Sequence, residues 1–599
     1  MKKILFSTIL ALAATGTMTL TTSCEDQLDI EQKGVVPMEK FYKTDADAEA
    51  ALVAAYEGFM CNVVGRQPDV EGSPGIYTPH KLILNECGDD ILAAGENSGD
   101  NEFGIKLNQF YYDAELDVPK LFYSGLYLSV YTCNLVINNF QNADTQVKKR
   151  CVAEARVLRA YDYFLLANLW GTPPFVDHVL TGADQPYNCD KDPVHPMTHE
   201  QLIEWVANEC EEASADLDER KGQDDKDGAV KVTKGFAWAM AGKAYLFAGQ
   251  YEKAKTALKK VIDSGKYDLM PGNEYINNFH IEGDGNKEKV FEVNFEYYDG
   301  KGEWDGMKQR SSWMETNYWN WRSDHFAAAP QAVYAGIDGW GGLGVPQWFG
   351  DEFYANDGDS YRLKATLKHI DDAVYNMEYA DAKINAMTQA QKDTAHAIGI
   401  KDQLNGLYGN STWLAFKQMM KASDTDVRYG NNTRLNNYLV MRYAEVLLNY
   451  AETCLQTGDT PEAKKYINMI QQRAGSKTIS ETVDMEVLKR EKSYELWLEG
   501  CRWFDIMRWK DAKAIERIKN SGTAVTHLFD KVYRAPKADD KNVKWEHGTE
   551  ANSRFYTTTT SEAKDRGAEV GFKEGKHEYL PYPQTILDKN PNLKQNPGW

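Results

Sequence analysis

The stretch GKAYLFAGQYEKAKTALKKVI, residues 242–262, decides the fold class. Gly242 lies on a first helix, Gly249 makes a turn, and Ala254 and Leu258 fall on a second helix at the positions closest to the first. Small residues are needed at such positions because two helix backbones cannot approach closely across bulky side chains. The spacing predicts a helix-turn-helix unit of the tetratricopeptide type.

The stretch RYAEVLLNYAETCLQTGDTPEAKKYINMI, residues 442–470, repeats this arrangement around Gly458. Gly458 lies 209 residues after Gly249, so we expect scattered helix pairs and not a tandem array. A stable stack needs about three or more such units. The helical patterns at 121–140 and 153–174 are the expected further members, and generic helix pairs are the alternative interpretation.

The stretch AEARVLRAYDYFLLANLWGTPP, residues 153–174, is the most regular helical pattern in the chain. Its apolar residues recur at three- and four-residue spacing, which is typical of an amphipathic helix. We expect this helix to stop at Gly171, before Pro173 and Pro174.

Long segments without helical period separate the helical blocks. Residues 272–365 are rich in Gly, Asn, Asp and aromatics, and residues 521–578 are polar and irregular. Long unpatterned loops in a compact protein often carry binding sites. The sequence therefore predicts a mostly α protein, an α-α superhelix of tetratricopeptide-like helix pairs with a loop-rich, minor-β ligand-binding portion.

The first of these segments contains NYWNWRSDHF, residues 317–326, in which large rings stand among polar side chains. One interpretation is a core wedge whose polar neighbours face water, because aromatics dominate cores generally. The other is a platform on which a ligand lies. As a group in a polar, irregular segment the rings favour the platform, and the candidate ligand-binding residues are Trp304, Trp313, Tyr318, Trp319 and Trp321.

Motifs for catalysis and cofactor binding lack their required context. Residues 339–344 satisfy GxGxxG, but no Val/Ile-rich strand precedes them and Pro346 stands where a helix would have to start, so a turning loop is expected. Asp284 begins a calcium-loop pattern that Lys289 breaks. We assign no catalytic residue, no metal and no cofactor. A glycosidase-like carboxylate pair remains the alternative, because such pairs are defined in space.

The stretch KREKSYELWLEGCRWFDIMRWKDA, residues 489–512, spaces three glutamates four residues apart, namely Glu491, Glu495 and Glu499. On one helix they share a face and can interact with nearby cations. Glu499 with Arg502, and Asp505 with Arg508, form the expected pairs. An ordinary helix rich in ion pairs is the default interpretation.

Composition excludes some partners. The net charge is −21, and no Lys/Arg cluster could follow a phosphate backbone, so nucleic acid is not an expected ligand. Of nine cysteines, five lie inside helical apolar patterns and are expected to be small buried hydrophobes, namely Cys61, Cys133, Cys151, Cys454 and Cys501.

The N-terminus has the pattern of a signal peptide: Lys2 and Lys3, then an apolar run from residue 4 to about residue 20, then small residues. Thr22-Ser23-Cys24 looks like the lipobox of a bacterial lipoprotein, in which the cysteine becomes the lipid attachment point. We expect a signal peptide over 1–23 and a lipidated tether over 24–45. A cleaved signal with a chance cysteine is the alternative.

Several motifs in order resemble the SusD/RagB family of outer-membrane nutrient-binding lipoproteins. They stand behind the lipobox and are EARVLRAYDYF with LWGTPP, RYAEVLLNYAE, EKSYELWLEGCRWFDIMRW and the terminal LPYPQTILDKNPNLKQNPGW. The closing stretch is the most specific. The resemblance covers essentially the whole chain and departs in the loops at 272–365 and in the tail at 521–578.

The resemblance implies a cell-surface lipoprotein, anchored in the outer membrane by its N-terminal lipid. It would capture an oligosaccharide without catalysis and pass it to a SusC-like TonB-dependent transporter. It also implies a helical N-terminal part, 46–270, and a C-terminal part with variable binding loops, 271–599. A peptide-capturing member of the family, a secreted glycan-degrading lipoprotein and a structural helix-repeat scaffold are the alternatives.

Overall fold

The structure is a computed structural model of the 599-residue chain. It describes residues 41–64, 79–95, 101–182, 184–294, 318–322, 339–370, 386, 388, 407–425, 435–530, 556–562 and 569–599. The predicted signal peptide over 1–23 and the predicted lipidation site Cys24 lie outside these residues.

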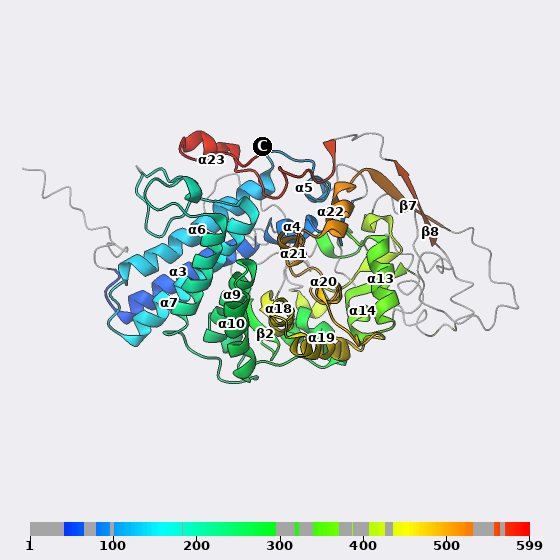
Figure 1. The fold of residues 1–599 in the computed structure, drawn as a ribbon, viewed down its shortest axis with the longest axis horizontal. Helices are drawn as coiled ribbons and strands as arrows, with labels where there is room; N and C mark the ends of the chain where they lie inside the picture. The colour runs from blue at the N-terminus through cyan, green and yellow to red at the C-terminus, as the bar shows by residue number, and fades with distance from the viewer. Residues whose placement is uncertain are drawn as a thin grey trace, which may run out of the picture.

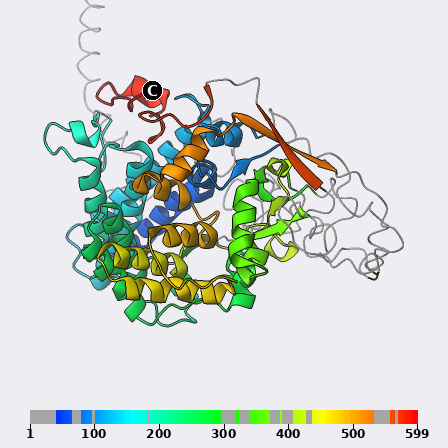
Figure 2. The same ribbon diagram turned by 45° about the vertical axis from the view of Figure 1, so that its right-hand side comes forward.

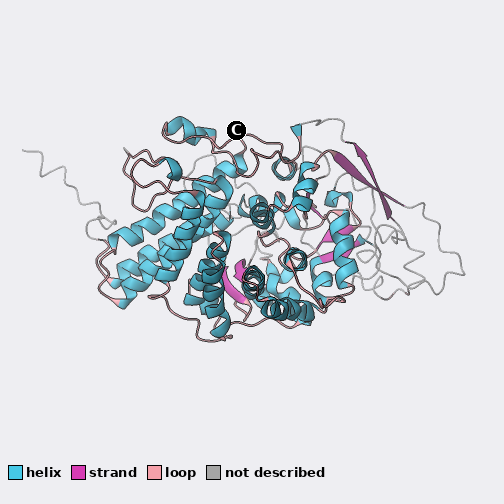
Figure 3. Cartoon of the chain, viewed as in Figure 1, coloured by secondary structure: helices cyan, strands magenta, loops and turns pink. Residues whose placement is uncertain are grey.

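Helices dominate the described chain, as Figures 1 and 3 show. The longer helices of the N-terminal half are α3 Asp45–Val64, α6 Asp117–Asn139, α7 Gln146–Trp170, α8 His199–Ala213, α9 Lys234–Phe247 and α10 Tyr251–Asp263. Shorter helices are α4 Pro79–Glu86, α5 Glu102–Asn108, η1 Cys189–Lys191, η2 Asp227–Ala229, η3 Gly272–Phe279 and η4 Ile281–Gly283.

The C-terminal half continues the helical body. Its helices are α13 Gln347–Asp357, α14 Tyr361–Thr366, η7 Leu407–Asn410, η8 Ala422–Asp424, α18 Tyr443–Gln456, α19 Thr460–Ala474, α20 Met485–Glu495, α21 Arg502–Trp509, α22 Ala512–Lys519 and α23 Gln584–Lys589. None of the described helices combines the length and the apolarity needed to cross a bilayer.

The two predicted helix pairs form as expected. The turn between α9 and α10 contains Gly249 at φ +70°, and the turn between α18 and α19 contains Gly458 at φ +81°, a region that glycine enters without strain. A Cβ atom at Gly242 would collide with the side chain of Leu258 on the facing helix. Glycine at this position is therefore what lets α9 and α10 pack closely.

The helix pairs stack side by side although the chain separates them. Consecutive packing joins α3 with α6, α7 with α8, α9 with α10, and then α10 with α18 and α18 with α19. Ion pairs reinforce the long-range junction, since Lys255 Nζ lies 2.9 Å from Asp459 Oδ2 and Lys243 Nζ lies 2.7 Å from Glu445 Oε1. The predicted superhelix is confirmed, and its two sequence-distant pairs are neighbours in it.

Helix α7 shows how local sequence sets the ends of an element. Its N-cap Thr145 accepts a hydrogen bond from the backbone N–H of Lys148, which satisfies one of the free donors of the first turn. The helix ends at Trp170, and Gly171 follows at φ +75°. The predicted stop is confirmed, while the start lies seven residues before the most regular part of the pattern, at Gln146.

Three small sheets complete the described fold. Antiparallel strands in the order β1-β3-β5-β4 form the first, from Leu92–Ala93, Leu343–Gly344, Trp413–Ala415 and Leu367–His369. Strands β2 Lys289–Val293 and β6 Tyr438–Arg442 form the second, and β7 Ala524–Asp530 and β8 Tyr556–Glu562 form the third. The minor-β expectation is confirmed.

The end of the chain packs against the end of α7. Trp170 Nε1 donates to the Pro581 carbonyl at 3.0 Å, and the Tyr582 hydroxyl donates to the Trp170 carbonyl at 3.0 Å. Asn596 Nδ2 donates to the Leu580 carbonyl at 2.7 Å and to the Trp170 carbonyl at 3.2 Å. Figure 2 shows this red segment beside the cyan N-terminal helices. Two motifs that lie more than 400 residues apart in the sequence therefore pack against each other.

One continuous cluster of buried residues forms most of the core, and it runs from Ala48 to Leu593. The two predicted parts, 46–270 and 271–599, therefore share one core, and their boundary stays a prediction. The seven cysteines whose side chains are described are free and buried, which confirms the expectation for four of the five predicted ones, Cys133, Cys151, Cys454 and Cys501. The side chain of Cys61 lies outside the description.

Candidate functional site

The aromatic segment 318–322 lies inside the protein. Tyr318, Trp319 and Trp321 are 2%, 4% and 2% exposed, and Trp321 Nε1 donates to the Ala415 carbonyl at 2.8 Å. In this structure the three rings are core residues, which matches the core-wedge interpretation of the sequence. We call this segment the aromatic wedge.

The candidates Trp304 and Trp313 lie outside the described residues. Ligand binding therefore stays a prediction for all five aromatic candidates. For the three rings of the wedge, direct stacking on a ligand would require a ring face that this conformation does not open to solvent.

Tyr318 anchors the aromatic wedge to two neighbouring helices. Its hydroxyl donates to Glu86 Oε1 at 3.3 Å, at the end of α4, and accepts a hydrogen bond from Asn101 Nδ2, at the start of α5. A Cβ atom at Gly342 would lie 2.8 Å from the Tyr318 ring, and one at Gly104 would collide with its hydroxyl. The two glycines thus make room for this ring.

Residues 339–344, which satisfy GxGxxG, form a loop. Backbone hydrogen bonds join this loop to the aromatic wedge. The N–H groups of Gly339, Gly341 and Gly342 donate to the carbonyls of Trp321, Asn320 and Tyr318, each at 3.0 Å. Gly341 has φ +66°. The segment ends in strand β3 and not in a phosphate-facing helix, so the expected turning loop is confirmed.

This loop presents an aromatic residue that the sequence interpretation missed. Trp340 is 42% exposed, while the glycines on either side of it are buried against the wedge. The exposed side chain of Trp340 gives this loop an apolar surface next to the wedge. A tryptophan between two glycines was the available signal, because glycine allows the backbone to turn tightly beside a large ring.

Two buried carboxyl groups, one of them in contact with the wedge, have raised pKa values. Burial raises the pKa of Glu86 to about 8, and its Oε2 has no hydrogen-bond partner among the described residues. Burial also raises the pKa of Asp90 to about 7, although the guanidinium of Arg502 opposes the shift. At neutral pH Glu86 is therefore a neutral acid next to Tyr318.

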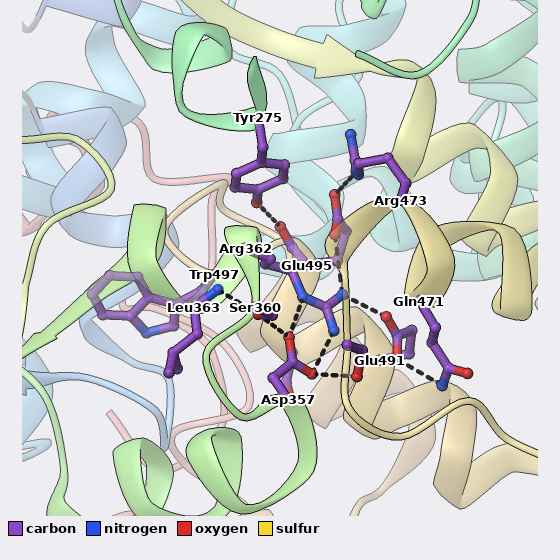
Figure 4. A network of polar contacts seen from close by, with 12 residues as sticks. Tyr275, Asp357, Ser360, Arg362, Leu363, Gln471, Arg473, Glu491, Glu495 and Trp497 are labelled. Atoms are coloured by element: carbon purple, nitrogen blue, oxygen red, sulfur yellow. Dashed lines mark hydrogen bonds and ion pairs between the residues drawn. The ribbon is translucent and has the colours of Figure 1, made fainter. Parts of the chain in front are cut away.

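The predicted glutamate face forms a buried ion network, shown in Figure 4. Arg362 donates from Nε to Asp357 Oδ2 at 3.0 Å, from Nη1 to Glu495 Oε2 at 3.1 Å, and also to Glu491. The side chains of these four residues are fully buried.

A second arginine, Arg442, binds the other oxygen of Glu495 and two further carboxylates. Arg442 Nη1 donates to Glu288 Oε1 at 2.7 Å and to Glu495 Oε1 at 2.6 Å, and its Nε donates to Glu499 Oε2 at 2.7 Å. Burial alone would raise the pKa of Glu495, but Arg473, Arg442 and Arg362 together hold it well below its usual value. These carboxylates are buried and paired with arginines, as in a structural cluster.

The expectation of one continuous helix over 489–512 is wrong. Helix α20 ends at Glu495 and α21 begins at Arg502, because Leu498 and Gly500 adopt left-handed backbone conformations between them. The predicted Glu499–Arg502 pair does not form, since Arg502 Nε lies 2.7 Å from Asp89 Oδ1. The predicted Asp505–Arg508 pair does form, at 2.7 Å.

The segment that resembles a calcium loop receives an arginine side chain. Arg220 Nη2 donates to the carbonyls of Gly285 at 2.9 Å and Asn286 at 3.0 Å, and its Nη1 donates to the Lys289 carbonyl at 2.6 Å. In the described parts of the chain, no group of three or more His, Cys, Asp or Glu side chains is placed to hold a metal ion.

The fold and this site define a class: a helical superhelix of tetratricopeptide-like pairs that carries a loop-rich face with buried and exposed aromatics. The model of the SusD family matches residues 249–599, and a second family model, described as "Starch-binding associating with outer membrane", matches residues 94–246. The chain therefore belongs to the SusD family.

Curated relatives align over most of the chain. The "Starch-binding protein SusD" of Bacteroides thetaiotaomicron is 23% identical over 587 residues, which cover 90% of this chain and 97% of that protein. The "SusD-like protein P38" of Formosa agariphila is 22% identical and covers 85% of this chain and 92% of its own.

Solved structures share the fold. The surface glycan-binding protein A from Bacteroides thetaiotaomicron, in complex with laminarihexaose, superposes with a TM-score of 0.66 at 20% identity, over 92% of this chain and 100% of that chain. A laminarin-binding SusD-like protein gives a TM-score of 0.64 at 20% identity, over 93% and 100% of the two chains.

Proposed function

We propose that this protein is a lipoprotein of the outer-membrane surface that captures oligosaccharides without catalysis and delivers them to a SusC-like TonB-dependent transporter. The match of the SusD family over more than half of the chain, with the same helical fold, carries the proposal. The relatives whose names state a ligand bind starch, laminarin or laminarihexaose, which supports a glycan as the ligand.

The exposed ring of Trp340 supports a capture site at the loop-rich face. A sugar ring has one face of C–H groups, and stacking it on an indole removes apolar area from water without requiring a charge. Burying one large side chain's worth of apolar surface stabilises a complex by roughly 1.5–3 kcal/mol. Trp304 and Trp313, predicted to bind ligand, would extend this surface.

The state of the buried carboxylates supports a non-catalytic role. A glycosidase needs two carboxyl groups that flank the scissile bond. The glutamates that the sequence brings together, Glu491, Glu495 and Glu499, are paired with arginines and closed to solvent. Glu491 and Glu495 tie α20 to Arg362 on α14 and to Arg442 at the end of β6, and their buried side chains offer no surface to a sugar.

A titration tests the proposal. The chain without residues 1–24 lacks none of the described residues and would be titrated with laminarihexaose, maltohexaose and other oligosaccharides, with tryptophan fluorescence and reducing ends measured together. We expect a saturable change in fluorescence and no new reducing ends. Trp340→Ala, Trp304→Ala or Trp313→Ala should weaken binding at least about tenfold if that ring stacks on the sugar.

The controls separate binding from folding. Tyr361→Ala removes a ring that is 54% exposed at the start of α14 and should leave the affinity unchanged. Trp319→Ala and Trp321→Ala remove buried rings and should reduce stability by about 3–5 kcal/mol, so their binding must be compared with their unfolding. New reducing ends would instead make the protein a glycan-degrading enzyme, and binding of peptides alone would make it a peptide-capturing member of the family.

A further inference from the structure

A cleft lies on the opposite face of α5 from the aromatic wedge. It encloses about 630 Å³ between α5, the turn that leads into α6, and residues 569–577 near the C-terminus. Clefts that bind small ligands have volumes of about 300–1,000 Å³. Its walls include Phe103, Tyr111, Tyr112, Glu115, Glu569 and Lys573.

Helix α5 separates this cleft from the wedge. Asn101 and Gly104 face Tyr318, as the contacts at its hydroxyl show. Phe103 and Lys106 line the cleft instead. Because positions three residues apart share one side of a helix, the two faces of this short helix serve two different surfaces.

An unusual backbone conformation places an aromatic ring at the cleft. Phe110 has φ +52°, a conformation that is uncommon for a bulky residue. Its ring is held by Trp503 at 5.6 Å and by Phe572 at 5.5 Å between ring centroids, which stabilises the turn. The next residue, Tyr111, is 41% exposed. The turn thus buries one ring and presents the following one to solvent.

The charges around the cleft nearly balance. Three lysines and four carboxylate residues line it, and His577 is neutral because burial, with Lys576 and Lys573 nearby, lowers its pKa to about 3. Among the described residues the side chains of Glu115, Glu569 and Lys573 form no ion pair, so they are available to a ligand as acceptors and a donor. This lining favours neither an anion nor a cation.

We propose that this cleft is a second saccharide-binding site for neutral oligosaccharides. Hydroxyl groups both donate and accept hydrogen bonds, so they match a rim that mixes ammonium and carboxylate groups. The exposed face of Tyr111 supplies the apolar surface for a sugar ring. The inference rests on the proposed glycan capture and extends it to a place outside the loop-rich face.

Hydrogen exchange with peptide resolution tests this site. The full chain would be measured by mass spectrometry with and without laminarihexaose, maltohexaose and cellohexaose, and with an acidic hexamer, oligogalacturonate. We expect a neutral hexasaccharide to slow exchange in 569–577 and in 109–117. The segment 569–577 is the decisive one, because it lines the cleft and lies far from the wedge in sequence.

Two matched variants identify the residue responsible. Tyr111→Ala should weaken the midpoint of protection in 569–577 about tenfold or more. Tyr131→Ala removes a ring of similar exposure, 44%, on α6 and should leave that midpoint unchanged. Both rings are exposed, so both variants are expected to fold.

Other outcomes overturn the inference in distinguishable ways. Protection near 318–322 and 339–344 but not in 569–577 would leave glycan capture standing and refute the second site. Protection of 569–577 by the acidic hexamer alone would refute a neutral ligand. The absence of protection anywhere would count against both the cleft and the proposed function for these sugars.

Discussion

Glu86 is a residue whose protonation state couples folding to pH. Its carboxyl group is fully buried, accepts a hydrogen bond from Tyr318, and has a pKa raised to about 8 by burial. In an unfolded chain a glutamate has a pKa of about 4.3. The folded state therefore holds a proton that the unfolded state has lost over the range between these two values.

The sign of the resulting effect follows from linkage. Between about pH 4.3 and pH 8 the folded state binds more protons at this site, so the free energy of unfolding falls as pH rises, by up to about 1.4 kcal/mol per pH unit. Glu86→Gln keeps the shape and the hydrogen bond without the ionisation. We expect the variant to lose this part of the slope, as measured by urea unfolding at pH 5, 6.5 and 8.

Comparing the two proteins removes the contributions of other titrating groups, such as Asp90. Parallel slopes for the wild type and for Glu86→Gln would show that folding does not raise the pKa of Glu86. Glu86→Leu serves as a second comparison, because it removes both the charge and the hydrogen bond to Tyr318 and should also be insensitive to pH at this site.

Residue roles around the wedge could be predicted only in part. The sequence indicated large rings in a polar segment, but the choice between core and platform depends on what covers them. Gly342 and Gly104 leave the space in which the Tyr318 ring is buried, and both belong to other segments of the chain. Trp340 was not predicted as a surface ring, because the glycines on either side of it were interpreted only as part of a GxGxxG match.

At the scale of elements, Gly242 controls how closely α9 and α10 pack. Gly242→Ala places a Cβ atom against Leu258 and should reduce the free energy of unfolding by about 1–3 kcal/mol through overpacking, even though alanine favours a helix. Chemical denaturation measures the change.

A control glycine isolates the packing effect. Gly222→Ala introduces the same methyl group at a position where no atom lies within 4 Å, and it should change stability by no more than about 0.5 kcal/mol. Equal effects of the two substitutions would refute the role assigned to the contact between Gly242 and Leu258.

The helix pairs were predictable because their signals are local. The small residues and the turn glycines at 249 and 458 specify each pair within about thirty residues. The junction of α10 with α18 was not predictable, since it joins segments far apart in the chain. The break between α20 and α21 was not predicted because Leu498 adopts φ +60°, a backbone conformation that is rare for leucine.

At the scale of the whole molecule, the C-terminal segment closes the core. Removing residues 579–599 would expose Trp170, which is fully buried and bonded to Pro581 and Tyr582. We expect the shortened chain to lose its cooperative thermal transition or to show it at a much lower temperature, as measured by calorimetry.

Adding the segment back provides the control. A synthetic peptide of residues 579–599 should raise the transition temperature of the shortened chain further at each higher peptide concentration, because a ligand that binds only the folded form stabilises it by RT ln(1 + [L]/Kd). A peptide with Tyr582→Ala and Asn596→Ala should not. An unchanged transition in the shortened chain would mean that the terminal segment is dispensable for the core.

The contact between Trp170 and the last residues also sets an order of events during synthesis. A ribosome releases the N-terminal helices first, and domains generally begin to fold as they emerge. The partner of Trp170 is made more than 400 residues later. Trp170 therefore lacks these partners while the N-terminal helices emerge, and its part of the core stays open until residues 581–596 have been made.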